Sequence, residues 1–207
     1  MLDKKNVIIG YSGHAYVVAE SFISKGNTVS YYTDLNESSN NLFNLTYLGF
    51  EFSADFKGWE MQLNFILGIG DNNLREKAGN LILSKSMQLV SVIDANAIIS
   101  KSSYIGLGVF ASKGVLVNAF SKIENFTILN TGCIIEHECE IGTAVHIGPG
   151  AVLAGNVKVG NRSYIGANTV IKQGIKIGDD VIIGAGSVII KDVISNTKLV
   201  GNPGRLI

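Results

Sequence analysis

The chain has 207 residues, enough for one large or two small domains. Its 17 basic and 17 acidic residues cancel to a net charge of 0, and no block of like charge stands out, which argues against nucleic acid or an anionic membrane as main partner. No apolar run reaches the roughly 18 residues of a membrane span, Val7 to Ile9 is too short for a signal peptide, and two cysteines fit a reducing compartment, so we expect a cytoplasmic protein.

The composition changes along the chain near residue 88. Of the 17 aromatic residues, 12 precede residue 88, whereas 16 of the 24 glycines follow it. The two halves should therefore bury their cores by different means. We expect a domain boundary near Ser86 to Ser91, which divides the chain into residues 1–88 and 89–207.

The first half opens with an apolar run, Asn6 to Gly10, that predicts a buried strand. A helix should follow, because apolar side chains recur on one helical face at Ala15, Val18, Ala19, Phe22 and Ile23. The turn between strand and helix holds Ser12, Gly13 and His14. Such a turn lets backbone N–H groups and a helix N-terminus face a phosphate, although a plain tight turn explains the same residues.

Three further elements complete an α/β pattern. A second strand, Thr28 to Thr33, ends at Asp34, where Rossmann-like domains often hold an acid for a ribose or a base; a surface-loop aspartate is the simpler alternative. Asn64 to Ile69 predicts another strand, and the loop Gly70 to Asn73 follows it at the strand end where open sheets bind ligands. We expect a helix from Leu74 to Ser84 to lead into the second half.

From residue 93 onward the sequence repeats every six residues. The repeating positions are aliphatic except for one alanine: Ile93, Ile99, Ile105, Ala111, Val117, Ile123, Leu129, Ile135, Ile141, Ile147, Leu153, Val159, Ile165, Ile171, Ile177, Ile183 and Ile189. A small or β-branched residue stands two positions before most of them, and glycine often follows directly. A period of six fits neither the 3.6 residues of a helix turn nor one long alternating strand.

This period predicts a parallel β-helix. A short strand points the repeating residue and the residue two positions earlier inward, and two more residues turn a corner. Three sides close an 18-residue triangular coil, so seventeen repeats give about five and a half coils, stacked roughly 4.8 Å apart. Cys133 and Cys139 fall on inward positions, where a thiol packs as a small hydrophobe rather than acting as a nucleophile.

The corners offer candidate chemistry. His137 and Glu138 are corner residues, so both side chains can point outward, where an imidazole oriented by a carboxylate can take a proton from an amine or a hydroxyl. An exposed His-Glu pair without a role is the alternative. His146 should face outward from the strand before another corner. Small corner residues, Gly155, Ala167 and Ala185, would let an extended ligand approach the backbone, or they are ordinary tight corners.

The hexapeptide pattern over residues 91–190 resembles the left-handed β-helix acyltransferases, whose members are typically trimers; handedness and trimer follow from this resemblance. A closer resemblance, spanning nearly the whole chain, is to bacterial N-acetyltransferases of UDP-linked 4-amino sugars and to sialic acid O-acetyltransferases. It is carried by Asn130-Thr131-Gly132-Cys133-Ile134-Ile135-Glu136-His137-Glu138-Cys139, Ile141-Gly142, Val145-His146-Ile147, Ala154-Gly155-Asn156-Val157, the Gly10–His14 turn, the Gly70–Arg75 loop and the tail Val200-Gly201-Asn202-Pro203.

The resemblance implies roles for these residues. It makes His137 the general base and Glu138 its support. It makes His146 a contact of the acetyl-CoA thioester, and the backbone at Gly155, Ala167 and Ala185 the cofactor site. It assigns Ser12, Gly13, His14 and Asp34 to the nucleotide sugar. The implied fold is a Rossmann-like domain followed by a left-handed β-helix.

The implied activity is acetyl transfer from acetyl-CoA to the amine of a nucleotide-linked 4-amino-deoxysugar, with UDP as the expected nucleotide and no metal. O-acetylation of sialic acid or a related surface-polysaccharide sugar is the alternative. The tail reads Asn-Pro-Gly-Arg where relatives often have Asn-Pro-Ala-Lys, and the segment Asn36 to Gly58 matches no pattern, so the sugar and the base stay open. A zinc hydratase on the same solenoid would need three histidine ligands, but the solenoid half has only His137 and His146.

Overall fold

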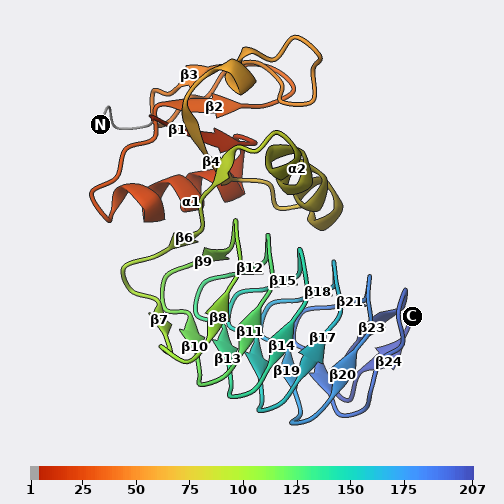
Figure 1. The fold of residues 1–207 in the computed structure, drawn as a ribbon. Coiled ribbons are helices and arrows are strands. Elements are labelled where there is room, and N and C mark those ends of the chain that lie inside the picture. The colour runs from red at the N-terminus through yellow and green to blue at the C-terminus, as the bar shows by residue number, and fades with distance from the viewer. Residues whose placement is uncertain (1–4) are drawn as a thin grey trace.

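The computed structural model describes residues 5–207 and consists of an α/β domain that lies against a solenoid (Figure 1). The α/β domain is a five-stranded parallel sheet in the order β3-β2-β1-β4-β5. Its elements are β1 (Lys5–Ile9), α1 (Gly13–Ile23), β2 (Tyr31–Thr33), β3 (Thr46–Tyr47), the 3-10 helix η1 (Lys57–Glu60), β4 (Leu63–Leu67), α2 (Asn72–Ser84) and β5 (Gln88–Leu89).

Both predicted helices of this domain are present, with two differences from the sequence pattern. In α1, Ala15, Val18, Ala19 and Phe22 are buried as predicted, but Ile23 is 39% exposed because it is the last residue of the helix. The second difference concerns α2, which begins at Asn72 rather than Leu74. The Asp71 carboxylate caps this helix by accepting a hydrogen bond from the Leu74 backbone N–H at 2.8 Å.

The segment between β2 and β3, unassigned from the sequence, is anchored by tyrosine hydroxyls. The Ser38 backbone N–H donates to the Tyr32 hydroxyl at 2.9 Å, and the Phe43 backbone N–H donates to the Tyr11 hydroxyl at 3.1 Å. Tyr11 and Tyr32 stack with their ring centroids 4.1 Å apart. The segment is therefore fixed on side chains of the sheet and its first turn, not by its own regular structure.

The solenoid confirms the six-residue period, because each of the seventeen repeating positions is the second residue of one two-residue strand from β6 to β22. These strands form three parallel sheets in which partners differ by 18 residues. We name each sheet by its outward face, which meets the α/β domain, carries aliphatic side chains or carries mostly charged side chains.

The domain-facing sheet contains β6 (Val92–Ile93), β9 (Phe110–Ala111), β12 (Ile128–Leu129), β15 (His146–Ile147), β18 (Tyr164–Ile165), β21 (Ile182–Ile183), and the tail strands β23 (Lys198–Val200) and β24 (Arg205–Leu206). The aliphatic sheet contains β7 (Ile98–Ile99), β10 (Leu116–Val117), β13 (Ile134–Ile135), β16 (Val152–Leu153), β19 (Val170–Ile171) and β22 (Val188–Ile189). The charged sheet contains β8 (Tyr104–Ile105), β11 (Lys122–Ile123), β14 (Glu140–Ile141), β17 (Lys158–Val159) and β20 (Lys176–Ile177).

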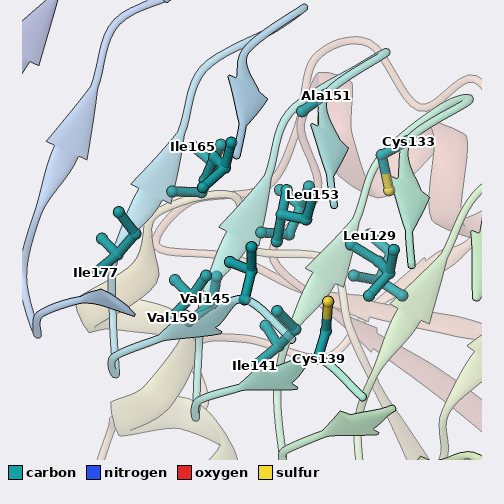
Figure 2. Close-up of a cluster of buried hydrophobic side chains, with 14 of the residues drawn as sticks. Leu129, Cys133, Cys139, Ile141, Val145, Ala151, Leu153, Val159, Ile165 and Ile177 are labelled. Carbon is teal, nitrogen blue, oxygen red and sulfur yellow. The ribbon is translucent and has the colours of Figure 1, made fainter. Parts of the chain in front are cut away.

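The inward side chains of the three sheets form one continuous apolar core, part of which Figure 2 shows. Cys133 and Cys139 are free and fully buried in it, and burial raises the pKa of their thiols to about 12 and about 11. Most inward hydroxyls are satisfied by the neighbouring backbone; Ser121 Oγ, for example, donates to the Glu136 carbonyl at 2.7 Å, whereas Ser112 Oγ bonds to Thr131 Oγ1. The predicted packing role of both cysteines therefore agrees with the structure.

The α/β domain packs on the domain-facing sheet. Its two apolar clusters include solenoid residues: Phe126 and Ala144 in one, and Val92, Phe110 and Ile128 in the other. Gly79 of α2 is required at this contact, since a Cβ there would lie 2.7 Å from the Phe126 ring. Within residues 5–207, no helix combines the length and apolar character needed to span a membrane.

Candidate active site

The predicted His-Glu pair lies at the corner between β13 and β14, where the aliphatic and charged sheets meet. We call this corner column the His137 edge. The side chains of His137 and Glu138 are 49% and 64% exposed and point outward, with His137 Nδ1 3.0 Å from Glu138 Oε2. An Nδ1–H that donates to this carboxylate leaves the Nε2 lone pair free to accept a proton.

Gly155 lies one coil further along the same edge and makes room for the imidazole. A Cβ at this position would lie 2.5 Å from both Cε1 and Nε2 of His137. The ring therefore rests over the backbone of Gly155. Room for this ring is a second reason for a glycine here, besides the predicted contact with the cofactor.

Ala167 and Ala185 lie on a different column, the corners between the domain-facing and aliphatic sheets, which we call the alanine edge. Within residues 5–207, the backbone N–H groups of Gly155, Ala167 and Ala185 donate to no acceptor. In the corners of Gly155 and Ala167, the residue that follows donates its N–H to a carbonyl of the preceding coil. Such unpaired N–H groups suit an extended ligand that carries carbonyl oxygens. Their role as a cofactor site stays a prediction.

The predicted nucleotide turn follows β1 as expected. Ser12 is the N-cap of α1, and Ser12 and Gly13 are exposed at the helix N-terminus. One carboxylate oxygen of Asp34 holds this turn, because Oδ2 accepts from the Tyr11 N–H at 2.9 Å, while Oδ1 accepts from the N–H of the next residue, Leu35, at 2.7 Å. The carboxylate therefore fixes the turn next to the helix N-terminus.

The structure brings together two histidines that the sequence assigned to different ligands. His14, from α1, and His146, from β15, have ring centroids 6.2 Å apart at the junction of the two domains. The His146 ring also packs edge-on against Tyr164 at 5.0 Å, and its Nε2 lies 3.2 Å from Asn130 Nδ2. His146 faces out of the coil as predicted, but on a different sheet from His137.

Both junction histidines are held neutral. Burial, and then the charge of Arg75, lowers the pKa of His14 to about 4. Burial, and then Arg75 and His14, lowers the pKa of His146 to about 3, against a hydrogen bond to the Gly70 carbonyl that raises it. In the neutral state each imidazole offers one donor and one acceptor, and His14 Nε2 is buried without a hydrogen-bond partner among residues 5–207.

Sequence reasoning missed three polar residues around this pair. Asn130 contacts His146, and Asn72 and Arg75 of α2 bond to solenoid carbonyls. For Asn72 and Arg75, the available signal was a cluster of polar residues at the start of a predicted helix. A cleft of about 380 Å³ opens beside Tyr164, and it is lined by Gly70, Asp71, Asn72, Asn73, Arg162, Tyr164 and Ile182.

Two family models match this chain. The PglD N-terminal domain matches residues 5–82, and the bacterial transferase hexapeptide (six repeats) matches residues 138–173 and 156–191. Together they cover both parts of the fold.

Several solved structures match over the whole length. PerB from Caulobacter crescentus, solved with CoA and GDP-perosamine, is 34% identical, with a TM-score of 0.92 over 99% of this chain and 98% of that chain. A histidine variant of perosamine N-acetyltransferase from the same organism reaches a TM-score of 0.94 at 34% identity, over 99% and 97% of the two chains. The acetyltransferase domain of PglB from Neisseria gonorrhoeae, solved with acetyl coenzyme A, is 28% identical, with a TM-score of 0.90 over 99% of each chain.

These matches confirm the predicted fold class, a Rossmann-like domain followed by a left-handed parallel β-helix. They also confirm the predicted enzyme class, an acetyltransferase. The chain belongs to the hexapeptide-repeat sugar acetyltransferases that carry a PglD N-terminal domain.

Proposed function

We propose that this enzyme transfers the acetyl group of acetyl-CoA to the amino group of a nucleotide-linked 4-amino-deoxysugar, with His137 as general base. The observation that carries the reaction is the outward His137–Glu138 pair, seated over Gly155 with Nε2 free. The N-acetyltransferase match at 34% identity over 99% of this chain supports an amine as acceptor. Two free, buried cysteines fit a reducing cytoplasm.

The chemistry is a direct transfer. The amine nitrogen attacks the thioester carbonyl, a C–N bond forms, and the C–S bond breaks to release CoA. His137 Nε2 takes the proton from the amine and passes it to the departing thiolate, while Glu138 stabilises the imidazolium. A backbone N–H at the cofactor site stabilises the oxyanion. No acyl-enzyme is needed, because both thiols are buried and protonated.

The nucleotide end of the acceptor fits the first turn of the α/β domain. The exposed N-terminus of α1 at Ser12 and Gly13 suits a diphosphate, because free N–H groups and the helix dipole both favour negative charge. His14 and Asp34 border this turn. UDP is the nucleotide expected from the sequence, and the relative bound to GDP-perosamine makes GDP the second nucleotide to test.

We propose a homotrimer, because the candidate site is divided among separate edges of one chain. His137 and Gly155 lie on one edge of the aliphatic sheet, and Ala167 and Ala185 lie on the other. A neighbouring copy that presents its alanine edge to the His137 edge would unite them. Such head-to-tail contacts close into rings. The outward column of the aliphatic sheet suits this contact: Ile98, Leu116, Ile134, Val152, Val170 and Val188.

Two matched substitutions test this interface. Val170, 43% exposed on the aliphatic sheet, and Lys176, on the adjacent strand of the charged sheet, are each changed to Glu. We expect Val170→Glu to lower the molar mass in light scattering from trimer to monomer, and Lys176→Glu to leave the trimer intact. Trimers from both variants would place the interface elsewhere.

The acceptor is tested by following release of free CoA from acetyl-CoA with the purified enzyme. The acceptors are GDP-perosamine, a UDP-linked 4-amino-deoxysugar and free sialic acid. We expect turnover with at least one 4-amino sugar and none with sialic acid. The O-acetyltransferase alternative requires the opposite result.

A further inference from the structure

Arg75 of α2 is the largest fully buried side chain, with a relative exposure of 1%. It forms no ion pair within residues 5–207; its acceptors are neutral. The guanidinium donates to the carbonyls of Phe126 (2.6 Å), Gly70 (2.8 Å), Ala144 (2.8 Å), Val145 (3.2 Å) and Ile69 (3.3 Å), and to Asn72 Oδ1 (2.8 Å). Burying a cation without a carboxylate partner costs free energy. A role other than stability should therefore explain why Arg75 is present.

The acceptors of Arg75 surround the junction histidines. The Gly70 carbonyl accepts from the guanidinium, and the Gly70 backbone also forms a hydrogen bond with His146. Val145, another acceptor, directly precedes His146 in the chain. One guanidinium therefore ties the Gly70 loop of the α/β domain to the solenoid strand that carries His146.

The charge of Arg75 acts on both imidazoles. His146 faces His14 on α1, Arg75 on α2, Tyr164 on β18 and Asn130 at the end of β12. The carboxylates whose charge acts on Arg75 are Asp71 and Glu76, and Glu76 pairs with Arg162. A cation buried behind two imidazoles disfavours their protonation.

We propose that Arg75 is a positioning residue of the candidate active site, which fixes His146 against the Gly70 loop and, together with burial, keeps the His14–His146 pair uncharged. The inference rests on the proposed function, in which His14 borders the nucleotide sugar and His146 contacts the acetyl-CoA thioester. Neutral imidazoles can accept hydrogen bonds from an incoming amine or hydroxyl, whereas imidazolium groups would repel an ammonium.

The competing explanation is a purely structural tie between the domains. Arg162 provides the comparison, because it also joins the solenoid to α2 and bonds to Asp180 at 2.7 Å and to Glu76 at 3.3 Å. Its partners are carboxylates, and it is not among the groups that shift His14 or His146. Arg162→Gln is therefore the matched loss of an interdomain arginine.

Histidine NMR gives a test that does not depend on activity. The chain has three histidines, so ¹³C-histidine labelling resolves His14 and His146, with His137 as internal reference. In the full-length trimer we expect Arg75→Gln to raise both titration midpoints by about one pH unit. Arg75→Lys keeps the charge and should leave them near the wild type, as should Arg162→Gln. Unchanged midpoints in folded Arg75→Gln would overturn the electrostatic part of the proposal.

Kinetics test the positioning part with the acceptor found above. We expect Arg75→Lys to lower kcat about 10-fold or more at unchanged KM for acetyl-CoA, since it keeps the charge but not the six-bond geometry. A kcat within two-fold of the wild type in Arg75→Lys would overturn this part. If Arg75→Gln does not fold, Arg75→Lys and Asn72→Ala test the positioning role instead. Asn72→Ala removes one acceptor of the guanidinium, and the positioning role requires a lower kcat in both variants. An enzyme inactive with every acceptor, but with the expected NMR shifts, would instead count against the proposed function.

Discussion

The two histidine sites of this chain contrast sharply. His137 stands at an exposed corner beside a carboxylate, 3.0 Å from Glu138. His14 and His146 lie partly buried at the domain junction, beside a cation rather than a carboxylate. The first site provides a carboxylate that orients the ring, and the second disfavours the charged imidazolium. The same side chain can therefore serve as a proton carrier at one site and as a neutral hydrogen-bonding group at the other.

Removing the imidazole of His137 should have a large effect on catalysis. We expect His137→Ala to lower kcat by roughly 100-fold or more, the usual weight of general base catalysis. The trimer and its melting temperature should not change, since the side chain is exposed. Turnover close to the wild type would contradict the assignment of His137 as the base.

Displacing the same imidazole should have a smaller effect. In Gly155→Ala the new Cβ would meet the His137 ring at 2.5 Å, so the ring must move. We expect kcat to fall by about 10-fold to 100-fold, as for a base misplaced by about 1 Å. The double variant His137→Ala/Gly155→Ala separates two explanations: its kcat should equal that of His137→Ala alone. A further rise in the KM for acetyl-CoA would instead indicate a direct cofactor contact at Gly155.

At the partly buried His14–His146 pair, stability should depend on pH. The pKa values of His14 and His146 are about 4 and about 3 in the folded state, below the ordinary 6.5 of an unfolded chain. The unfolded state therefore binds more protons below pH 6.5, and stability is lost as the pH falls from 6.5 towards 4. We expect the melting temperature of His146→Gln to fall less steeply than that of the wild type between about pH 7 and about pH 5. Equal slopes would contradict the neutral state of His146.

The solenoid could be predicted strand by strand from the sequence, for a physical reason. Every sixth side chain must enter a narrow apolar core, so burial acts at each repeat and leaves a local pattern, as at Cys133 and Cys139. The corners follow from the same register. The outward position of His137 was therefore available from counting alone.

The α/β domain and the junction were less accessible, because their order depends on contacts that are distant in sequence. The segment after β2 is held by the hydroxyls of Tyr11 and Tyr32, which no local pattern reports. Arg75 reads as a surface residue of an amphipathic helix, yet it bonds to carbonyls 51 to 70 residues away. The meeting of His14 and His146 likewise depends on how the two domains pack.

Because the coils stack on one another, the number of residues in the solenoid determines the length of the solenoid. Each 18 residues add one rung of about 4.8 Å and return the chain to the same edge. Gaining or losing a whole coil beyond Gly155 would lengthen or shorten the alanine edge while the corner at His137 stays in place. Gaining six residues would instead rotate every later corner by one side and send Ala167 and Ala185 away from their column. A chain with this architecture can therefore change the length of this edge, with its columns intact, only in steps of three hexapeptides.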